Sequence, residues 1–356
     1  MNTTSAECAE NAAQYSVKRS RRARRQHRAW VVGAAAALCT ALLPGITPHA
    51  SADSHADRAY VANADGDTVS VIDLKTKKVT DTIAVGDVPV DVAVDPTRSR
   101  AYVTNAGGDN VSVIDTKTNK VIAGIPVGDR PRDVAVDPAR GRAYVTNNGD
   151  DNVSVIDTKT NKVIATIAVG DVPWGVALDV ARNRAFVTNQ ESGTVSVIDT
   201  NTNTVITDIP VGLAPRGVAV DSKRARVDVA NQSSDTVSVI NSNSNFVTAT
   251  IPVGDGPYAV AEDPTRALAY VANVFISTVS VINTTSNAVI ATIHVGNGPS
   301  GIALDRTGDR VYVTNYDDDN VSVINAKTDT VVDTIPVGDG PIGIDILPGA
   351  SQAKHS

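Results

Sequence analysis

The sequence contains very little sulfur: two cysteines, Cys8 and Cys39, and one methionine in 356 residues. Both cysteines precede residue 53, where we expect the mature chain to begin. A mature chain without cysteine can form no disulfide, no thiolate metal site and no thiol nucleophile. Its stability must therefore come from packing, which a chain of about 300 residues can supply.

Histidine is scarce as well. After residue 52 the chain holds His55, His294 and His355, which are far apart in the sequence. Such spacing predicts no histidine-rich metal site, and we find no Ser-His-Asp arrangement. The acidic stretch 317–320 lacks the spacing of a calcium-binding loop. We therefore expect no metal site, no cofactor and no catalytic residues.

The first 52 residues have the composition of a signal peptide. Seven basic side chains precede an apolar run over 29–43, and Ala50-Ser51-Ala52 offers small residues for cleavage. The run has about 15 residues, fewer than the ~20 of a spanning helix, although an uncleaved anchor is the alternative. We expect a secreted or cell-surface protein, exported by the general secretory route or, on the weaker sign of Arg21-Arg22, by the twin-arginine route.

Removing this leader makes the chain more acidic. The leader carries seven basic and two acidic residues, so its loss takes the formal net charge from −7 to −12. An acidic surface disfavours nonspecific binding to nucleic acid or to an anionic membrane.

A repeat of 42 residues runs through the rest of the chain. A V-G pair, a proline and an asparagine each recur at this spacing, in seven units. The asparagines are Asn63, Asn105, Asn147, Asn189, Asn231, Asn273 and Asn315. We interpret their side chains as bonding the backbone of the following turn. Units of this length with four strands are typical of β-propellers.

Each unit contains four short runs rich in Val, Ile and Tyr, with turn residues between them. In the second unit these runs are 91–94, 101–104, 111–115 and 121–125. The first unit lacks its innermost run, and the last unit has an extra one at 343–346. We predict an all-β fold, a seven-bladed propeller over 53–348 with four antiparallel strands per blade, closed by the C-terminal strand in the N-terminal blade. Residues 349–356 are expected to form a disordered tail.

The unit resembles a known repeat. Tyr102-Val103-Thr104-Asn105 and Tyr144-Val145-Thr146-Asn147 spell the signature of the YVTN β-propeller repeat family, and the V-S-V-I-D-T segments resemble it too. The chain is similar to the YncE-like and surface-layer-type members over about residues 58–348, which implies an exported or surface-associated propeller. The resemblance says little about activity, because propellers include binding modules, lactonases and lyases.

Departures from the repeat are the candidates for function. The residue after the repeated proline changes from blade to blade: Val90, Arg132, Trp174, Arg216, Tyr258, Ser300 and Ile342. We expect this position to surround the mouth of the central channel, with Arg130 and Asp133 close by. Arginines beside aromatic rings suit an anionic or planar ligand. The alternative is that these side chains are solvated and vary freely.

A second departure lies in the sixth blade. Val274-Phe275-Ile276 occupies a loop whose counterparts are polar, and Tyr316 holds the equivalent position one blade on. Such a loop predicts a hydrophobic partner-binding patch or, alternatively, a loop folded back onto its own blade.

A third departure is a pair of acids. Asp228 replaces the repeated aromatic residue, and Glu262 replaces an apolar residue of an inner strand. A buried carboxylate must find a cation or keep its proton, and such groups mark functional sites. The alternative is a structural pairing with Arg224, Arg226 or Arg266.

The sequence is compatible with three functions. The first is an exported, non-catalytic binding module that captures a small anionic or planar ligand, or a protein partner, at the channel mouth. The second is a hydrolase or lyase of the propeller lactonase type, which a divalent metal near Glu262 would favour. The third is binding of single-stranded nucleic acid on Trp174 and Tyr258, against which the net charge argues. We expect a monomer.

Overall fold

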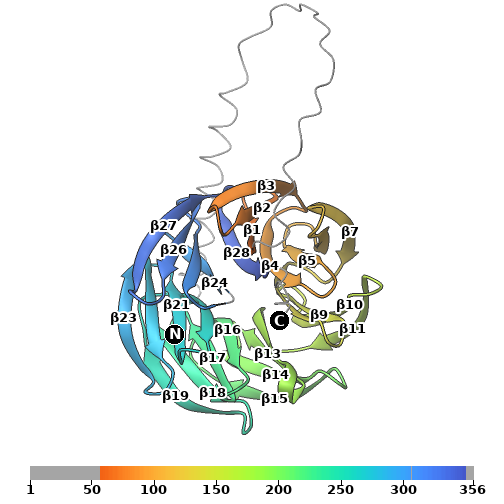
Figure 1. Cartoon of the computed structure of the whole chain (residues 1–356). Coiled ribbons are helices and arrows are strands. Elements are labelled where there is room, and N and C mark those ends of the chain that lie inside the picture. The colour runs from red at the N-terminus through yellow and green to blue at the C-terminus, as the bar shows by residue number, and fades with distance from the viewer. Residues whose placement is uncertain (1–56, 306, 350–356) are drawn as a thin grey trace, which may run out of the picture. The chain divides into compact units, whose positions relative to one another are not determined.

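The computed structural model describes residues 57–305 and 307–349, which form seven four-stranded antiparallel sheets arranged in a ring (Figure 1). The predicted signal peptide, and the predicted tail apart from Gly349, lie outside these residues. Within them, one 3-10 turn, η1 (Val180–Arg182), accompanies the strands. The prediction of a seven-bladed propeller is confirmed.

The blades are numbered along the chain, and each strand order runs from the channel outward. The strands are β28 (Pro341–Leu347), β1 (Arg58–Asn63), β2 (Thr68–Asp73) and β3 (Lys78–Ala84) in blade 1; β4 (Pro89–Asp95), β5 (Arg100–Asn105), β6 (Asn110–Asp115) and β7 (Lys120–Pro126) in blade 2; β8 (Pro131–Asp137), β9 (Arg142–Asn147), β10 (Asn152–Asp157) and β11 (Lys162–Ala168) in blade 3; β12 (Pro173–Asp179), β13 (Arg184–Asn189), β14 (Thr194–Asp199) and β15 (Thr204–Pro210) in blade 4; β16 (Pro215–Asp221), β17 (Arg226–Asn231), β18 (Thr236–Asn241) and β19 (Phe246–Pro252) in blade 5; β20 (Pro257–Asp263), β21 (Leu268–Asn273), β22 (Thr278–Asn283) and β23 (Ala288–His294) in blade 6; and β24 (Pro299–Leu304), β25 (Arg310–Asn315), β26 (Asn320–Asn325) and β27 (Thr330–Pro336) in blade 7.

The two middle strands of each blade are buried on both faces because neighbouring blades stack face to face. Tyr102, Val111 and Val113 of blade 2 pack against Val145 and Ile156 of blade 3 in one apolar cluster. The alternation of apolar residues with serine in the V-S-V-I segments fits this environment, since small and large side chains interdigitate there. The outer strands face solvent on one side and are mostly exposed.

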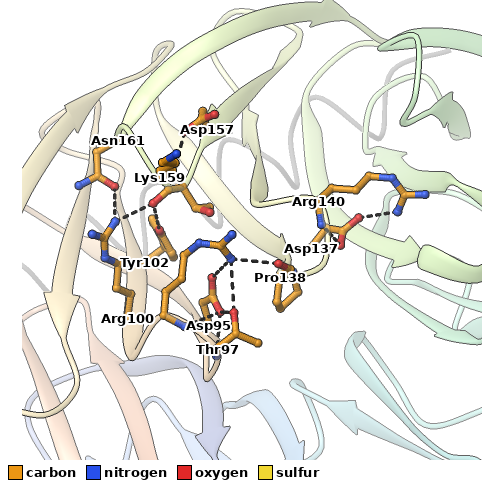
Figure 2. Close-up of polar contacts among 12 residues, drawn as sticks. Asp95, Thr97, Arg100, Tyr102, Asp137, Pro138, Arg140, Asp157, Lys159 and Asn161 are labelled. Atoms are coloured by element: carbon orange, nitrogen blue, oxygen red, sulfur yellow. Dashed lines mark hydrogen bonds and ion pairs between the residues drawn. The ribbon is translucent and has the colours of Figure 1, made fainter.

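Polar contacts fasten each blade to the next at the end opposite the mouth (Figure 2). Arg98 forms an ion pair with Asp95 at 3.0 Å and donates to the Pro138 carbonyl of the following blade at 3.0 Å. Arg100 donates to the Thr158 carbonyl at 2.6 Å and to Asn161 Oδ1 at 3.0 Å. Equivalent contacts recur in blades 3, 4 and 5, so each of blades 2 to 5 fixes two turns of the following blade. Blade 6 has Leu268 at the position of Arg100.

The repeated asparagine has a different role from the one we predicted from the sequence. Asn147 Nδ2 donates to Asn152 Oδ1 at 2.7 Å and to Ser154 Oγ at 2.8 Å, so its partners are side chains of the next strand and not turn backbone. The repeated V-G glycine packs directly on this amide. A Cβ on Gly128 would lie 2.7 Å from Asn147 Cγ, which explains why the position holds glycine.

The ring is closed as expected. β28 pairs with β1 antiparallel, from Arg58 opposite Leu347 to Asn63 opposite Pro341. Blade 1 therefore takes three strands from the start of the propeller and one from its end. Closure removes the open sheet edge that a linear array of blades would leave.

We expect Asn147→Ala to lower the free energy of unfolding by about 2–3 kcal/mol, because it removes two buried hydrogen bonds and leaves Ser154 unsatisfied. Urea denaturation measures the change. The matched control is Thr160→Ala, which removes an exposed contact to Asp157 and should cost no more than about 0.5 kcal/mol. Equal losses in the two variants would contradict this role for the asparagine.

Candidate ligand site at the channel mouth

Two sets of loops form the face around the channel mouth, as the sequence predicted. The loop that follows each repeated asparagine pairs with the turn that enters the inner strand of the same blade. In blade 2, Ala106 N donates to the Val88 carbonyl at 2.9 Å and Gly107 N donates to the Asp87 carbonyl at 3.0 Å. The residue after each repeated proline, near the start of the inner strand, therefore lies at this end of the channel.

Four of the variable side chains at the mouth form one continuous stack. The guanidinium carbon of Arg132 lies 4.5 Å from the Trp174 ring centroid, and that of Arg216 lies 4.0 Å from it. Arg216 also lies 5.0 Å from the Tyr258 ring centroid. The two rings meet edge to face, with centroids 6.0 Å apart. Four consecutive blades thus contribute alternating cations and aromatic rings to one surface.

Threonines of the repeat hold the backbone beneath this stack. Thr146 Oγ1 donates to the Trp174 carbonyl at 2.7 Å and accepts from Asp133 N at 3.0 Å. Thr104 makes the same bond to the Arg132 carbonyl at 2.8 Å, and Thr188 to the Arg216 carbonyl at 2.5 Å. These threonines belong to the Y-V-T-N motif, so the fold motif itself positions three of the four stacked residues.

Below the stack, the channel encloses a cavity of about 400 Å³ that is lined by all seven inner strands. Its wall is not symmetric. Asp345, Asp91 and Asp133 line it from three neighbouring blades, whereas Gly217, Gly301 and other small residues line it elsewhere. One side of the channel is therefore acidic.

The channel carboxylates are bound to the backbone of the next blade. Asp345 Oδ2 accepts from Val94 N at 2.8 Å, and Asp133 Oδ2 accepts from Val176 N at 2.8 Å. Asp91 Oδ2 accepts from Val134 N at 3.2 Å. Each acid thus links its inner strand to the following one.

Burial changes the protonation of these acids. It raises the pKa of Asp91 well above its usual range, and the neighbouring Asp133 carboxylate raises it further. Burial also raises the pKa of Asp133, which a hydrogen bond with Asp91 partly offsets. Both carboxyl groups therefore keep their protons to a higher pH than exposed aspartates do, and Asp91 is the donor in the bond between them. Burial raises the pKa of Asp345 to about 6.

Arg130 and Tyr316, which the sequence also suggested for this site, are not part of the stack. Arg130 is exposed on the turn before β8, where its backbone N–H donates to Asp109. Tyr316 donates its hydroxyl to Asp65 at 3.0 Å, which ties the loop of blade 7 to that of blade 1. Its contact is thus to a neighbouring loop of the same face.

The apolar loop of blade 6 combines the two interpretations that the sequence left open. The Phe275 ring packs over Gly256, and the Ile276 side chain packs over Gly254, so the loop lies against its own blade. Nevertheless, 55% of Phe275 and 45% of Ile276 are exposed. Both side chains therefore present apolar surface to solvent.

Asp228 and Glu262 meet at the seam between blades 5 and 6, where other blades place a tyrosine or phenylalanine. Arg226 Nε lies 2.9 Å from Asp228 Oδ1 and 3.6 Å from Glu262 Oε1, and the three side chains are almost fully buried. Burial and the nearby Asp228 carboxylate raise the pKa of Glu262 to about 10, so Glu262 keeps its proton. The sequence analysis offered pairing with Arg224, Arg226 or Arg266 as the alternative to a functional site, and Arg226 is the partner found.

The sequence analysis placed Asp133 close to the mouth. It missed the alignment of Asp91, Asp133 and Asp345 along one side of the channel, and it missed the threonine anchors. The sequence does mark Asp91 and Asp133 as departures from the repeat. Both stand two residues after the repeated proline, where the other inner strands have glycine or alanine. The anchors gave a signal too, because this motif position is threonine in four blades and alanine in three: Thr104, Thr146, Thr188 and Thr314 against Ala62, Ala230 and Ala272.

Metal chemistry finds little support in the described part of the chain. Residues 57–305 and 307–349 contain no group of three or more His, Cys, Asp or Glu side chains placed to hold a metal ion. His294, the one histidine among them, ends the outer strand β23. Among the same residues, no helix is long and apolar enough to cross a membrane.

Together, the ring of seven sheets and the ligand-sized cavity beneath a cation–aromatic stack define a closed β-propeller with a candidate binding site on its axis. The chain belongs to the YncE-like β-propeller family, whose model matches residues 22–352. A comparison with curated proteins finds no match.

Solved structures share this fold at low sequence identity. A protein from Desulfotomaculum acetoxidans DSM 771, described as functionally unknown, is 17% identical with a TM-score of 0.73, and the match covers 82% of this chain and 99% of that one. Kuenenia stuttgartiensis hydrazine synthase is 22% identical (TM-score 0.67, 72% and 88% covered). Dihydro-heme d1 dehydrogenase NirN in complex with DHE is 14% identical (TM-score 0.65, 86% and 78% covered). At such identities the likeness establishes the fold alone.

We expect Thr146→Ala to change the near-ultraviolet circular dichroism of Trp174, because the variant releases the Trp174 carbonyl from its anchor. Thr314→Ala is the matched control, since Thr314 makes the same bond to the Ile342 carbonyl at 2.6 Å, away from the stack. Both variants should lose about 1 kcal/mol of stability. Identical dichroism in the two variants would show that the threonine does not position the ring.

The raised pKa of Asp345 predicts how the stability of the fold changes with pH. Its folded pKa of about 6 lies above the ordinary 3.8, so the unfolded chain ionises first as the pH rises. Its contribution to stability is therefore complete below about pH 4 and is lost by about pH 6, to the extent of at most about 3 kcal/mol. Asp345→Asn should flatten the fall in melting temperature between pH 4 and 6. An unchanged pH profile in that variant would refute the raised pKa.

Proposed function

We propose that this chain is an exported, non-catalytic binding module that captures a small, planar, anionic ligand at the channel mouth. The observation that carries the proposal is the alternating stack of Arg132, Trp174, Arg216 and Tyr258 above the channel cavity. The leader sequence supports export.

The chemistry of the stack favours a planar anion. A guanidinium group is always charged, and its N–H donors lie in one plane that matches a carboxylate or phosphate. Aromatic faces on either side of Arg216 offer stacking area to a flat ligand. The cavity of about 400 Å³ falls within the ~300–1,000 Å³ range of small-molecule sites.

The acids along the channel wall add selectivity to this site. Asp345, whose pKa is about 6, carries negative charge at neutral pH, while the arginines lie at the mouth. An anionic group is therefore held at the mouth and repelled from the interior on the side of Asp345. The ligand would place its anionic end among the arginines and its apolar or cationic end towards the channel.

A protein partner is the second candidate, and the exposed loop of blade 6 favours it. Phe275 and Ile276 present apolar surface on the same face as Leu213, which is 61% exposed. Scattered exposed apolar residues are common, but three on adjacent blades of one face suit a partner contact.

The test uses Trp174 as the reporter. In the full chain with Trp30→Phe, Trp174 is the single tryptophan. We would titrate this protein with benzene polycarboxylates and nucleoside monophosphates as planar anions, and with succinate as a non-planar one. We expect saturable quenching by a planar anion and at least about tenfold weaker binding in Arg132→Ala or Arg216→Ala, because each loses a charge-assisted contact.

Ile342→Ala is the control, since Ile342 occupies the same ring position outside the stack and should bind as wild type. Equal responses to planar anions and to succinate would refute recognition of planarity. No response to any of them, together with partner capture that Phe275→Ser abolishes, would favour the second candidate.

A further inference from the structure

A cluster of lysines lies at the end of the propeller opposite the channel mouth. It occupies the turns between the third and outer strands of blades 1, 2 and 3, whose outer strands β3, β7 and β11 are neighbours on the rim. We call these residues the lysine arc: Lys75, Lys77, Lys78, Lys117, Lys120, Lys159 and Lys162. All are exposed except Lys77, which is half-buried.

The other blades provide an internal comparison. At the positions of Lys117 and Lys120, blade 4 has Asn201 and Thr204, and blade 5 has Asn243 and Phe246. Blade 6 likewise has Thr285 and Ala288, and the single lysine of the blade 7 turn, Lys327, is paired with Asp309 at 3.0 Å. The fold of the turn therefore does not require lysine, and the lysines of these turns are concentrated in blades 1 to 3. In another turn at the same end, blade 5 exposes Lys223 and Arg224.

The turns of blades 2 and 3 that carry the arc are held in place by the preceding blade. Arg100 donates to the Thr158 carbonyl and to Asn161 Oδ1 (Figure 2). Thr158 directly precedes Lys159, and Asn161 directly precedes Lys162. In the same way Tyr60 donates to Asn119 Oδ1 at 3.0 Å, between Lys117 and Lys120. The lysine stems therefore start from a rigid backbone, although their tips are exposed.

Few carboxylates accompany the arc, and each has a local partner. Asp115 caps its own turn by accepting from Thr118 N at 2.9 Å, and Asp157 does the same with Thr160 N at 2.7 Å. Lys77 pairs with Asp333 at 3.0 Å, but an exposed pair of this kind is weak and exchanges readily.

The net negative charge of the protein does not cancel the field of the arc. Most of the exposed acids lie in the loops at the other end: Asp65, Asp67, Asp87, Asp109, Asp129, Asp150, Asp151, Asp171, Glu191, Asp235, Asp255, Asp317 and Asp318. Strands of 6–7 residues separate the two ends by about 20 Å. The Debye length at physiological ionic strength is only about 8 Å, so a ligand at one end is screened from the other.

We infer that the lysine arc is a docking surface for a linear polyanion whose charges are phosphate groups. Lysine is a compact, hydrated point charge that attracts phosphate without demanding one geometry. A curved row along three neighbouring blades can follow a chain, whereas an anionic membrane would face this whole end, including the turns before the outer strands of blades 4 to 6, which carry no lysine. Tyr60, Tyr102 and Tyr144 of these blades are buried, so stacking on bases is not part of the recognition.

The probe is end-labelled inorganic polyphosphate, with binding to the full chain followed by fluorescence anisotropy at several salt concentrations. The test variant replaces four lysines with the residues of blade 4: Lys117→Asn, Lys120→Thr, Lys159→Asn and Lys162→Thr. We expect binding at least about tenfold weaker, with a smaller dependence on salt. Its melting temperature and the Trp174 signal should be unchanged, because the new turns are ones that the fold already uses.

A second variant keeps these changes and restores the charge at scattered exposed positions, one in each of blades 4 to 7, with Ile206→Lys, Phe246→Lys, Ile290→Lys and Val332→Lys. Its binding of polyphosphate should stay weak, because the lysines of blades 2 and 3 are still missing from the arc. Recovery of wild-type affinity would show that total charge alone matters, and wild-type affinity in the first variant would show that the lysines are only solvated turns. Tighter binding of a single-stranded oligonucleotide of equal charge, or of anionic vesicles, would also overturn the inference.

Discussion

The packing of each blade against the next is the contact on which the rest of this molecule depends. The middle strands are buried on both faces only because a neighbour covers each face, and Tyr102 of one blade completes the core of the following one. No blade could bury its apolar residues alone. The ring must therefore close, and the pairing of β28 with β1 makes the first and last parts of the propeller one blade.

The same dependence explains why polar residues recur so strictly. Arg100 and the motif threonines bond across the boundary between blades, and the asparagines join strands within a blade. These bonds fix the backbone where they occur, although alanine replaces the threonine in blades 1, 5 and 6 and Leu268 replaces the arginine in blade 6. Once the backbone is fixed, side chains that point into the channel or out of the turns can differ from blade to blade without affecting the fold. The stack at the mouth and the lysine arc are both differences of this kind.

The seam between blades 5 and 6 shows how far such variation can extend into the interior. Asp228 removes an aromatic ring from the contact between blades, and Glu262 replaces an apolar residue of the facing strand. Arg226 compensates both changes with one guanidinium group, and Glu262 keeps its proton. A buried carboxylate is thus accommodated by pairing and protonation, as the cost of desolvating a charge requires. This arrangement is a structural substitution for the tyrosine.

The sequence by itself determined the number of blades, the four strands in each and the closing strand, because a 42-residue repeat fixes which residues are equivalent. It also identified the variable ring at the mouth, since Arg132, Trp174, Arg216 and Tyr258 depart from a monotonous pattern. Only the tertiary structure decided that these four side chains stack on one another, that the asparagines bond side chains, and that Asp91, Asp133 and Asp345 share one side of the channel. The reason is physical: a repeat specifies position within a blade, whereas contacts between blades depend on the curvature of the ring and on rotamers, which no local pattern encodes.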